Sequence, residues 1–305
     1  MRITVAVLTT GARSDALDAC LGAIAALAAP EGATLRTLVV QNGREAPDRA
    51  ALGPAADAFA PGALDVAAEP RRGIPFARNA AIDRAAADGA THLAFIDDDA
   101  YPDADWLTRL SAEMGKTGAE AASGPQAPVF PEDAPLHLRG AEIYRERRLS
   151  QGALCDWAAT NNVMFSLAFV QERGLRFNED LRTGGSDKEF FLRFTRAGGR
   201  IVWAADAVVR EPVIAERLDA AWATRRAYRY GSTGYSIESA IRPAPLAALI
   251  CVAKGGYYVL SGLARLPAAA LAPESPAWID GRCRLAHGAG FFLGMSQAFR
   301  PRRYA

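Results

Sequence analysis

The sequence predicts an α/β fold, in which a mostly parallel sheet carries helices on both faces. Apolar runs of strand length alternate with segments of helical periodicity through the first third of the 305 residues, the rhythm of a parallel sheet with helical crossovers. Polar residues end three of those runs, at Thr9, at Asn42 and at the triplet Asp97-Asp98-Asp99. Because ligands bind beyond the carboxyl ends of the strands in such sheets, we expect these side chains to line one binding site at that edge of the sheet.

Each element of the first third is predicted from a local pattern. Four apolar runs bounded by turn-forming residues are the expected strands: residues 3–8, 35–40, 64–68 and 92–96. Ser14 can cap a helix between the first two strands. Pro75 opens a second helix at a position where proline is tolerated, and Gly89 closes it. Asp103 is expected to cap a third helix, which contains Trp106.

The middle of the chain is less regular. Residues 125–135 contain several prolines and are predicted to be a loop. Ser166 is expected to cap a short helix that ends at Gly174. The remaining predicted elements are strands at 158–165, 200–204 and 207–209, and helices at 187–197 and 218–230.

Composition excludes several classes of protein. Half of the residues are hydrophobic and the net charge is +1, so the chain is expected to be globular and no nucleic-acid partner is expected. The cysteines are scattered without a zinc-binding pattern and are expected to be buried thiols in a reducing compartment: Cys20, Cys155, Cys251 and Cys283. The sequence begins directly with a strand-like run, without a charged and apolar leader, so we expect the catalytic part in the cytoplasm.

The triplet Asp97-Asp98-Asp99 is the strongest chemical signal. It follows the apolar run 92–96, and three carboxylates at the tip of a buried strand are costly unless something neutralises them. Hard divalent cations such as Mg²⁺ and Mn²⁺ prefer oxygen ligands and often hold phosphates. The alternative is a purely structural role, in which the triplet forms a solvated turn followed by a helix cap and binds no metal. The apolar strand makes an enzyme acting on a nucleotide or a sugar-nucleotide the favoured hypothesis.

Five motifs in order give the chain a family resemblance. They are Val5-Ala6-Val7-Leu8-Thr9-Thr10, Val39-Val40-Gln41-Asn42-Gly43, Gly73-Ile74-Pro75-Phe76-Ala77-Arg78-Asn79, Phe95-Ile96-Asp97-Asp98-Asp99 and Gly184-Gly185-Ser186-Asp187-Lys188-Glu189. Together they resemble the family 2 glycosyltransferases, which have the GT-A fold. Within that family the chain looks most like bacterial enzymes of exopolysaccharide assembly, of the succinoglycan type. The resemblance covers roughly residues 1 to 235, most of a globular domain.

The resemblance implies roles on the donor side. Thr9 and Asn42 would lie beside the nucleotide base, although the family usually has Asp where Asn42 stands, and Arg78 would lie near the nucleotide. Asn162, within Thr160-Asn161-Asn162-Val163, matches a motif that lines the sugar and acceptor pocket.

The resemblance also implies a metal site and a base. Asp97 and Asp99 match the DxD motif, with Asp99 binding Mg²⁺ or Mn²⁺ and with Asp97 and Asp98 serving the ribose and the metal shell. Asp187 would be the general base that takes a proton from the acceptor hydroxyl in an inverting transfer. A carboxylate is favoured at the helix N-terminus expected there, although Asp187 could simply cap that helix.

The implied activity is transfer of a single sugar. The helix expected at 218–230 lacks the Gln-x-x-Arg-Trp motif of processive synthases. A UDP-sugar is the default donor and a glycan or a lipid-linked molecule the acceptor. Some relatives place a later metal ligand where this chain has Glu211, so Glu211 or no residue would fill that role. The alternatives are a metal-dependent nucleotidyltransferase, for which Thr9-Thr10-Gly11-Ala12-Arg13 is a poor phosphate loop, and a non-catalytic scaffold with the same fold.

The last 64 residues differ in composition, so we predict a catalytic domain at 1–241 and a basic, apolar, helical segment at 242–305. Basic residues outnumber acidic ones by six in that segment, and the stretch 246–263 is apolar except for Lys254. These features favour peripheral contact with the cytoplasmic face of the inner membrane. The alternative is a pair of buried helices that pack on the catalytic domain or on a second subunit, which the glycines at 288, 290 and 294 would permit.

Overall fold

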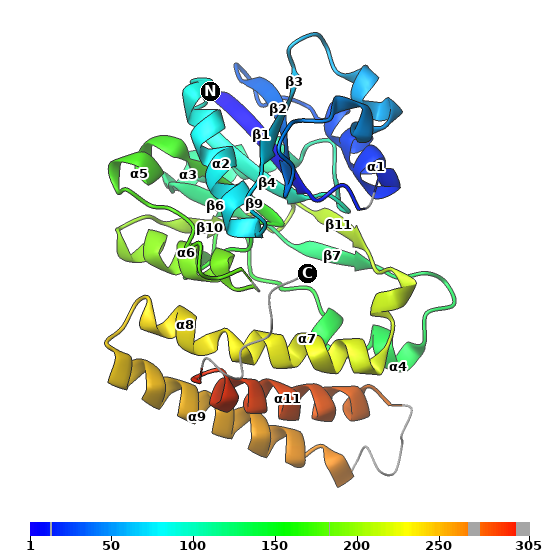
Figure 1. Ribbon diagram of the computed structural model, residues 1–305, viewed down its shortest axis with the longest axis vertical. Coiled ribbons are helices and arrows are strands. Elements are labelled where there is room, and N and C mark those ends of the chain that lie inside the picture. Colours follow the sequence, from blue (N-terminus) through cyan, green and yellow to red (C-terminus); the bar gives the residue numbers. More distant parts are fainter. Residues whose placement is uncertain (13, 183, 268–274, 297–305) are drawn as a thin grey trace. The chain divides into compact units, whose positions relative to one another are not determined.

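The computed structural model describes residues 1–12, 14–182, 184–267 and 275–296. Its contacts divide the chain into two compact units. The first consists of residues 1–127, 147–179 and 190–211, and the second of residues 128–146, 180–189 and 212–305. The predicted boundary after residue 241 lies inside the second unit. Figure 1 labels the elements of both units.

The first unit contains an eight-stranded sheet in the order β3-β2-β1-β4-β9-β6-β10-β8. Its strands are β1 (Arg2–Thr9), β2 (Thr34–Asn42), β3 (Leu64–Glu69), β4 (His92–Asp97), β6 (Ala121–Ser123), β8 (Leu154–Cys155), β9 (Asn162–Ser166) and β10 (Ile201–Trp203). The first four are parallel to one another, and β9 runs antiparallel to both β4 and β6. A second sheet has the order β5 (Tyr101–Pro102), β11 (Val209–Pro212), β7 (Gln126–Val129). The polar ends of β1, β2 and β4 therefore share one edge of the parallel part.

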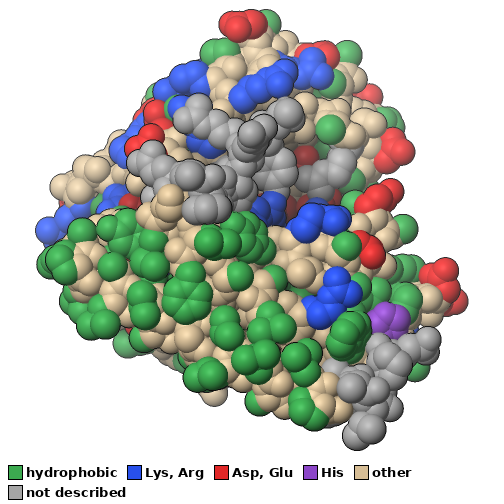
Figure 2. Space-filling model, turned by 60° about the horizontal axis from the view of Figure 1, so that its bottom comes forward, with side chains coloured by type: hydrophobic (Ala, Val, Ile, Leu, Met, Phe, Trp, Pro, Cys, Tyr) green, Lys and Arg blue, Asp and Glu red, His purple; other side chains and the backbone are tan. Residues whose placement is uncertain are grey.

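The second unit is built mainly from helices. They are α4 (Leu136–Arg139), α7 (Ala220–Ser232), α8 (Gly234–Ser239), α9 (Ala244–Leu263) and α11 (Pro276–Leu293). Glycines let α7 and α11 approach closely, since a Cβ on Gly290 would lie 2.3 Å from the Tyr228 carbonyl oxygen. Among the described residues one helix, α9, is long and apolar enough to cross a membrane by length and composition. Figure 2 shows apolar side chains gathered on the face to which α9 belongs.

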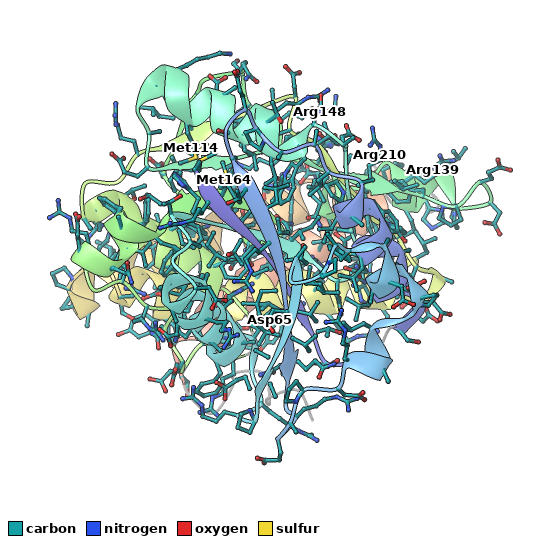
Figure 3. All side chains as sticks on the ribbon, turned by 90° about the horizontal axis from the view of Figure 1, so that it is seen from above. Asp65, Met114, Arg139, Arg148, Met164 and Arg210 are labelled. Atoms are coloured by element: carbon teal, nitrogen blue, oxygen red, sulfur yellow. The ribbon has the colours of Figure 1, made fainter. Side chains whose placement is uncertain are left out.

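Most predicted elements are confirmed. The strands predicted at 158–165 and 207–209 are shifted, to β9 (Asn162–Ser166) and β11 (Val209–Pro212), and two other local predictions are wrong. The helix α3 (Trp106–Thr117) has Asp105 as its N-cap residue, not Asp103. The Asp103 carboxylate instead pairs with Arg210 on β11, a partner 107 residues away that no local pattern reveals. Figure 3 labels Arg210 among the side chains of the structure. The stretch 125–135, predicted to be a loop, includes the strand β7. Ser166 does cap its helix, α5 (Leu167–Glu172), by accepting a hydrogen bond from the Phe169 N–H.

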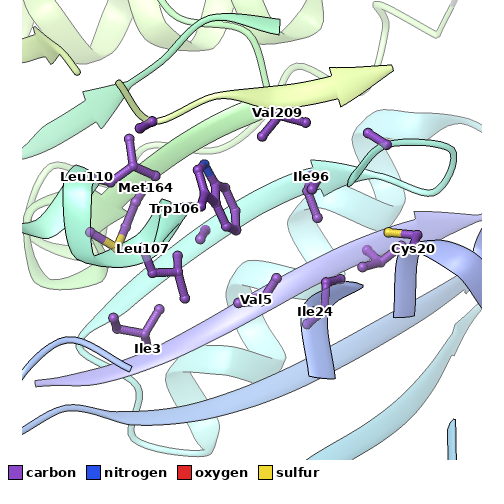
Figure 4. Close-up of a cluster of buried hydrophobic side chains, with 14 of the residues drawn as sticks. Ile3, Val5, Cys20, Ile24, Ile96, Trp106, Leu107, Leu110, Met164 and Val209 are labelled. Carbon is purple, nitrogen blue, oxygen red and sulfur yellow. The ribbon is translucent and has the colours of Figure 1, made fainter. Parts of the chain in front are cut away.

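Helices cover both faces of the large sheet. On one face, α1 (Ser14–Ala25) and α3 pack on side chains of β1 and β4 such as Val5 and Ile96 (Figure 4). On the other face, α2 (Ile74–Ala87) and α6 (Ser186–Arg196) bury side chains against Phe95 and its neighbours. Because both faces are covered, the central parts of β1 and β4 are apolar on both sides of the sheet, as in Val5-Ala6-Val7-Leu8 and Leu93-Ala94-Phe95-Ile96. All four cysteines are buried and free thiols, as expected. Cys20, on α1, belongs to the same buried cluster as Ile96 near the end of β4 (Figure 4).

Candidate active site

The acidic triplet begins with the last residue of β4, Asp97, and continues into a tight turn. The Ala100 N–H donates to the Asp97 carbonyl oxygen at 3.2 Å, which closes the turn. The Cys20 thiol donates to the same oxygen at 3.5 Å from the helix α1. Asp98 and Asp99 are buried, whereas Asp97 keeps part of its surface open to solvent. The sheet and α1 therefore fix the backbone that carries the three carboxyl groups.

The Asp97 carboxyl group is surrounded by negative charge. Burial and the carboxylates of Glu211, Asp99 and Asp98 raise its pKa to about 7, and the nearby Arg78 guanidinium only partly opposes them. Glu211 is the largest of the charged influences. Since Glu211 belongs to β11, the second sheet brings to Asp97 a carboxylate that lies 114 positions later in the chain. The result is a concentration of carboxylates from two separate segments of the first unit.

A chain of amide side chains holds Glu211. Gln126, on β7, donates from its side-chain nitrogen to a Glu211 carboxylate oxygen. The amide nitrogen of Asn161 donates in turn to the side-chain oxygen of Gln126. The sequence reasoning missed Gln126 and Asn161, because an isolated Gln or Asn carries no local signal for a contact 35 or 85 residues away.

Arg78 lies on α2 and is buried. Its guanidinium donates to the Thr160 hydroxyl and lies 5.3 Å above the centre of the Phe177 ring. The adjacent Asn79 holds the same segment, because its side-chain amide accepts from the Phe177 N–H at 2.8 Å and donates to the Phe177 carbonyl at 3.0 Å. The motif Ala77-Arg78-Asn79 thus places one cation beside the acidic cluster and anchors the loop after α5.

Thr9 and Asn42 lie at the ends of β1 and β2 and both serve local backbone. The Thr9 hydroxyl accepts from the Gly11 N–H at 3.0 Å. The Asn42 side chain accepts from the Gly73 N–H at 2.9 Å and donates to the Arg71 carbonyl at 2.8 Å. An aspartate could make the first bond but not the second, since an ionised carboxylate only accepts. Asn42 therefore fixes the loop that leads into α2, and its contact with a base stays a prediction.

Asn162 is wholly buried at the start of β9. Its side-chain oxygen accepts from the Trp106 indole N–H at 2.8 Å. Its amide nitrogen donates to the carbonyls of Pro125 at 2.8 Å and Ala207 at 2.7 Å. These bonds join α3, β9 and the segments that lead into β7 and β11, so Asn162 supports the strand that carries Glu211. Whether it also touches a sugar stays a prediction.

Asp187 belongs to the second unit, on the first turn of α6. The two preceding glycines have positive φ angles, +132° at Gly184 and +81° at Gly185, so the turn before the helix needs their freedom. A Cβ on Gly185 would lie 2.9 Å from Ile237 and 3.2 Å from the Thr233 hydroxyl oxygen, so this turn rests directly on α8. Asp187 remains partly exposed and accepts from the Lys188 N–H at 2.8 Å.

The acidic cluster suits a divalent cation that shares its coordination with a ligand. Among the residues the structure describes, no group of three or more His, Cys, Asp or Glu side chains is arranged to hold a metal ion. Mg²⁺ sites that serve nucleotides need fewer protein ligands, since one or two carboxylates are joined by phosphates and water. The raised pKa of Asp97 means that its charge is poorly compensated within the protein. Asp97 and Asp99 therefore fit such an ion.

Comparison with known proteins decides the family. The family model described as "Glycosyl transferase family 2" matches residues 5–169, more than half of the chain, and "Glycosyl transferase family group 2" matches residues 92–279. The chain belongs to glycosyl transferase family 2. This family 2 glycosyltransferase is 32% identical to the succinoglycan biosynthesis protein ExoM of Rhizobium meliloti (strain 1021) over 72% of its own length and 71% of ExoM. The predicted family, the predicted resemblance to exopolysaccharide enzymes and the transferase class are therefore confirmed.

Solved structures establish the GT-A fold of this family 2 glycosyltransferase. It resembles the mannosyltransferase PcManGT from Pyrobaculum calidifontis, solved with GDP-Man and Mn²⁺, with a TM-score of 0.61 and 21% identity over 94% of this chain and 86% of PcManGT. It also resembles residues 1–349 of S. aureus TarS in complex with UDP, with a TM-score of 0.51 and 17% identity over 94% and 90% of the two chains. Of a longer TarS chain it covers 42%. The predicted α/β sheet with helices on both faces is confirmed.

Proposed function

We propose that this family 2 glycosyltransferase is an inverting, metal-dependent enzyme that moves a single sugar from a nucleoside diphosphate donor. The observation that carries the proposal is the cluster of Asp97, Asp98, Asp99 and Glu211 beside Arg78. A UDP-sugar is the proposed donor, supported by the binding of UDP and UDP-GlcNAc to TarS, although PcManGT binds GDP-Man. The proposed acceptor is a glycan or a lipid-linked molecule of cell-surface polysaccharide synthesis, supported by the likeness to ExoM.

On the donor side, Asp97 and Asp99 would hold Mg²⁺ or Mn²⁺. When bound, the ion supplies positive charge that stabilises the departing diphosphate, so no protein acid is needed there. Glu211 adds to the negative charge that favours the cation and is itself oriented by Gln126. Arg78 contributes a fixed positive charge toward the donor phosphates or ribose.

On the acceptor side, Asp187 would take the proton. In the proposed reaction, the acceptor oxygen forms a bond to the anomeric carbon of the sugar while the bond from that carbon to the diphosphate oxygen breaks. The acceptor proton passes to the Asp187 carboxylate, and the nucleoside diphosphate leaves with the bonding electrons. A single displacement of this kind inverts the anomeric configuration. The glycine-rich turn that rests on α8 would fix Asp187 for this role.

The test separates the two carboxylate roles. The purified full chain is incubated with nucleotide-sugars, Mn²⁺ or Mg²⁺ and lipid extract, and nucleoside diphosphate release is measured together with the anomeric configuration of the product. We expect Asp99→Ala to abolish metal-dependent donor binding in calorimetry. We expect Asp187→Asn to retain donor binding and to lose turnover by roughly 10²- to 10⁴-fold, the usual contribution of a general base.

A matched control is Asp133→Asn, which removes an exposed carboxylate of the same unit and should leave both readouts unchanged. Full transfer activity in Asp187→Asn would overturn the assignment of the base. A product with retained configuration would overturn the single displacement, and pyrophosphate release would indicate nucleotidyl transfer instead.

A further inference from the structure

The helix α9 exposes an uncharged apolar face that runs along its whole length. Six large side chains of the helix are each 45–69% exposed: Leu246, Leu249, Val252, Tyr257, Leu260 and Leu263. Their spacing of three and five residues keeps them on one side of the helix. The sole charged residue of α9, Lys254, donates to a Glu238 carboxylate oxygen at 2.5 Å on α8. Figure 2 shows few charged side chains among the apolar ones on this face.

The opposite side of α9 is lined by small residues that seat it on α11. Gly255 and Gly262 are buried in this contact, and a Cβ on either would lie about 3 Å from Phe292 or from the Gly281 carbonyl oxygen. Such close packing leaves no room for the helix to rotate. The large apolar side chains therefore remain exposed on the surface of the second unit, and a contiguous exposed apolar face of this kind marks an interaction site.

The charges beside this face are predominantly positive. Toward the N-terminal half, Glu238 pairs with both Arg242 and Lys254. Toward the other end, Glu142 pairs with both Arg265 and Arg284, at 3.2 and 2.7 Å. Glu238 is thus shared by two cations. Beside Glu142 lie a second carboxylate, Asp280, and a third cation, Arg145. Cations therefore outnumber carboxylates by one in each of these two groups.

We propose that α9 docks on an anionic lipid bilayer and lies in the plane of its surface. The apolar face would enter the boundary between headgroups and acyl chains, and the cations at both ends would meet lipid phosphates, the arrangement of an interfacial helix. This docking goes beyond the proposed function. It depends on that function in one respect, the expectation that the acceptor is held at the membrane surface.

Two other occupants fit the charges less well. A second copy of the chain, paired through a two-fold axis, would bring positively charged ends against each other, which opposes association. A spanning orientation would place the ion pair of Lys254 with Glu238 within the hydrocarbon layer, where charged groups are costly. The anionic surface is complementary at both ends of the face.

The experiment is co-sedimentation of the full chain with vesicles of phosphatidylcholine alone or mixed with phosphatidylglycerol. We expect binding to the mixed vesicles, weakening at high salt because the charges are screened, and release by an alkaline wash. Leu249→Glu and Leu260→Glu should each weaken binding roughly tenfold or more, since each removes a buried leucine from the interface. Leu154→Glu is the matched control, because Leu154 is 68% exposed on β8 in the first unit, and it should bind as the wild type does.

Wild-type binding by Leu249→Glu and Leu260→Glu would overturn the proposal. Resistance to the alkaline wash would replace it with a spanning helix, and a concentration-dependent dimer that both variants abolish would replace it with self-association. Circular dichroism confirms that each variant is folded. Metal-dependent UDP binding, measured in solution on the same variants, is expected to be unchanged. Its absence in every protein, wild type included, would instead count against the proposed donor site while the vesicle result stood.

Discussion

Replacing Asp97 with asparagine should stabilise the metal-free protein at alkaline pH. The raised pKa of Asp97, about 7 against an ordinary value of 3.8, means that the folded protein holds this proton more tightly than the unfolded chain does. Stability from such a group is fully present below pH 3.8 and is lost as the pH rises through about 7. The substitution Asp97→Asn keeps the shape of the side chain and removes the charge, so the variant should escape that loss.

The magnitude follows from the shift. About three pKa units at roughly 1.4 kcal/mol each correspond to a penalty of about 4 kcal/mol once Asp97 is fully ionised. Partial exposure of the group lowers this figure. Between about pH 5 and about pH 8 the wild type should therefore lose up to roughly 3 kcal/mol that Asp97→Asn retains.

Urea denaturation in the presence of a chelator measures this difference. Wild type and Asp97→Asn are compared at several pH values, with Asp57→Asn, an exposed carboxylate, as the control that should follow the wild type. Adding Mn²⁺ at alkaline pH should stabilise the wild type far more than Asp97→Asn, because the cation neutralises the same charge. Parallel pH profiles for wild type and Asp97→Asn would refute the reasoning.

Two further predictions concern the free energy of unfolding, one for each unit. Asn162→Ala removes the partners of the Trp106 N–H and of two buried carbonyls, so urea denaturation should show a loss of roughly 3 kcal/mol. Gly290→Ala places a methyl group 2.3 Å from the backbone of α7 and should cost roughly 3 kcal/mol. A Cβ on Gly256, in α9, would meet open space, so Gly256→Ala should instead raise the free energy of unfolding by about 0.5–1 kcal/mol. Equal effects of the two glycine substitutions on the thermal midpoint would contradict the packing argument.

The sequence was sufficient to predict the parallel half of the fold because its signals are local. Apolar runs gave strands β1 to β4, and turn residues or caps placed the helices between them. Those runs contain no alternation, so they could not show that Val5 and Ile96 face one helical layer while Phe95 faces the other. Both layers are apolar, and only the register of the sheet assigns a side chain to one of them.

From the residues alone, site positions could be proposed only where polar side chains end a strand, and Arg78, Asn162 and Asp187 were proposed only through the family resemblance. Local pattern predicts Asp97, Thr9 and Asn42, because each ends an apolar run. The hydrogen bonds of Asn162, and those that link Asn161 through Gln126 to Glu211, instead join segments 35 to 85 residues apart. Such contacts depend on tertiary placement and leave no periodic trace. The predicted boundary after residue 241 was likewise drawn from composition, which cannot show that the turn carrying Asp187 packs on α8 within the second unit.

The helix α9 illustrates why apolar length alone is ambiguous. A core helix turns its largest apolar side chains inward, because burying them contributes most to stability. In α9 the order is reversed: Gly255 and Gly262 face α11, while Leu249 and Leu260 are about two-thirds exposed. Turning the helix around would gain apolar burial, but the glycine contacts with α11 leave no space for leucine there. The packing therefore fixes the leucines outward, and an apolar environment outside the protein, rather than a deeper place within it, is what would stabilise them.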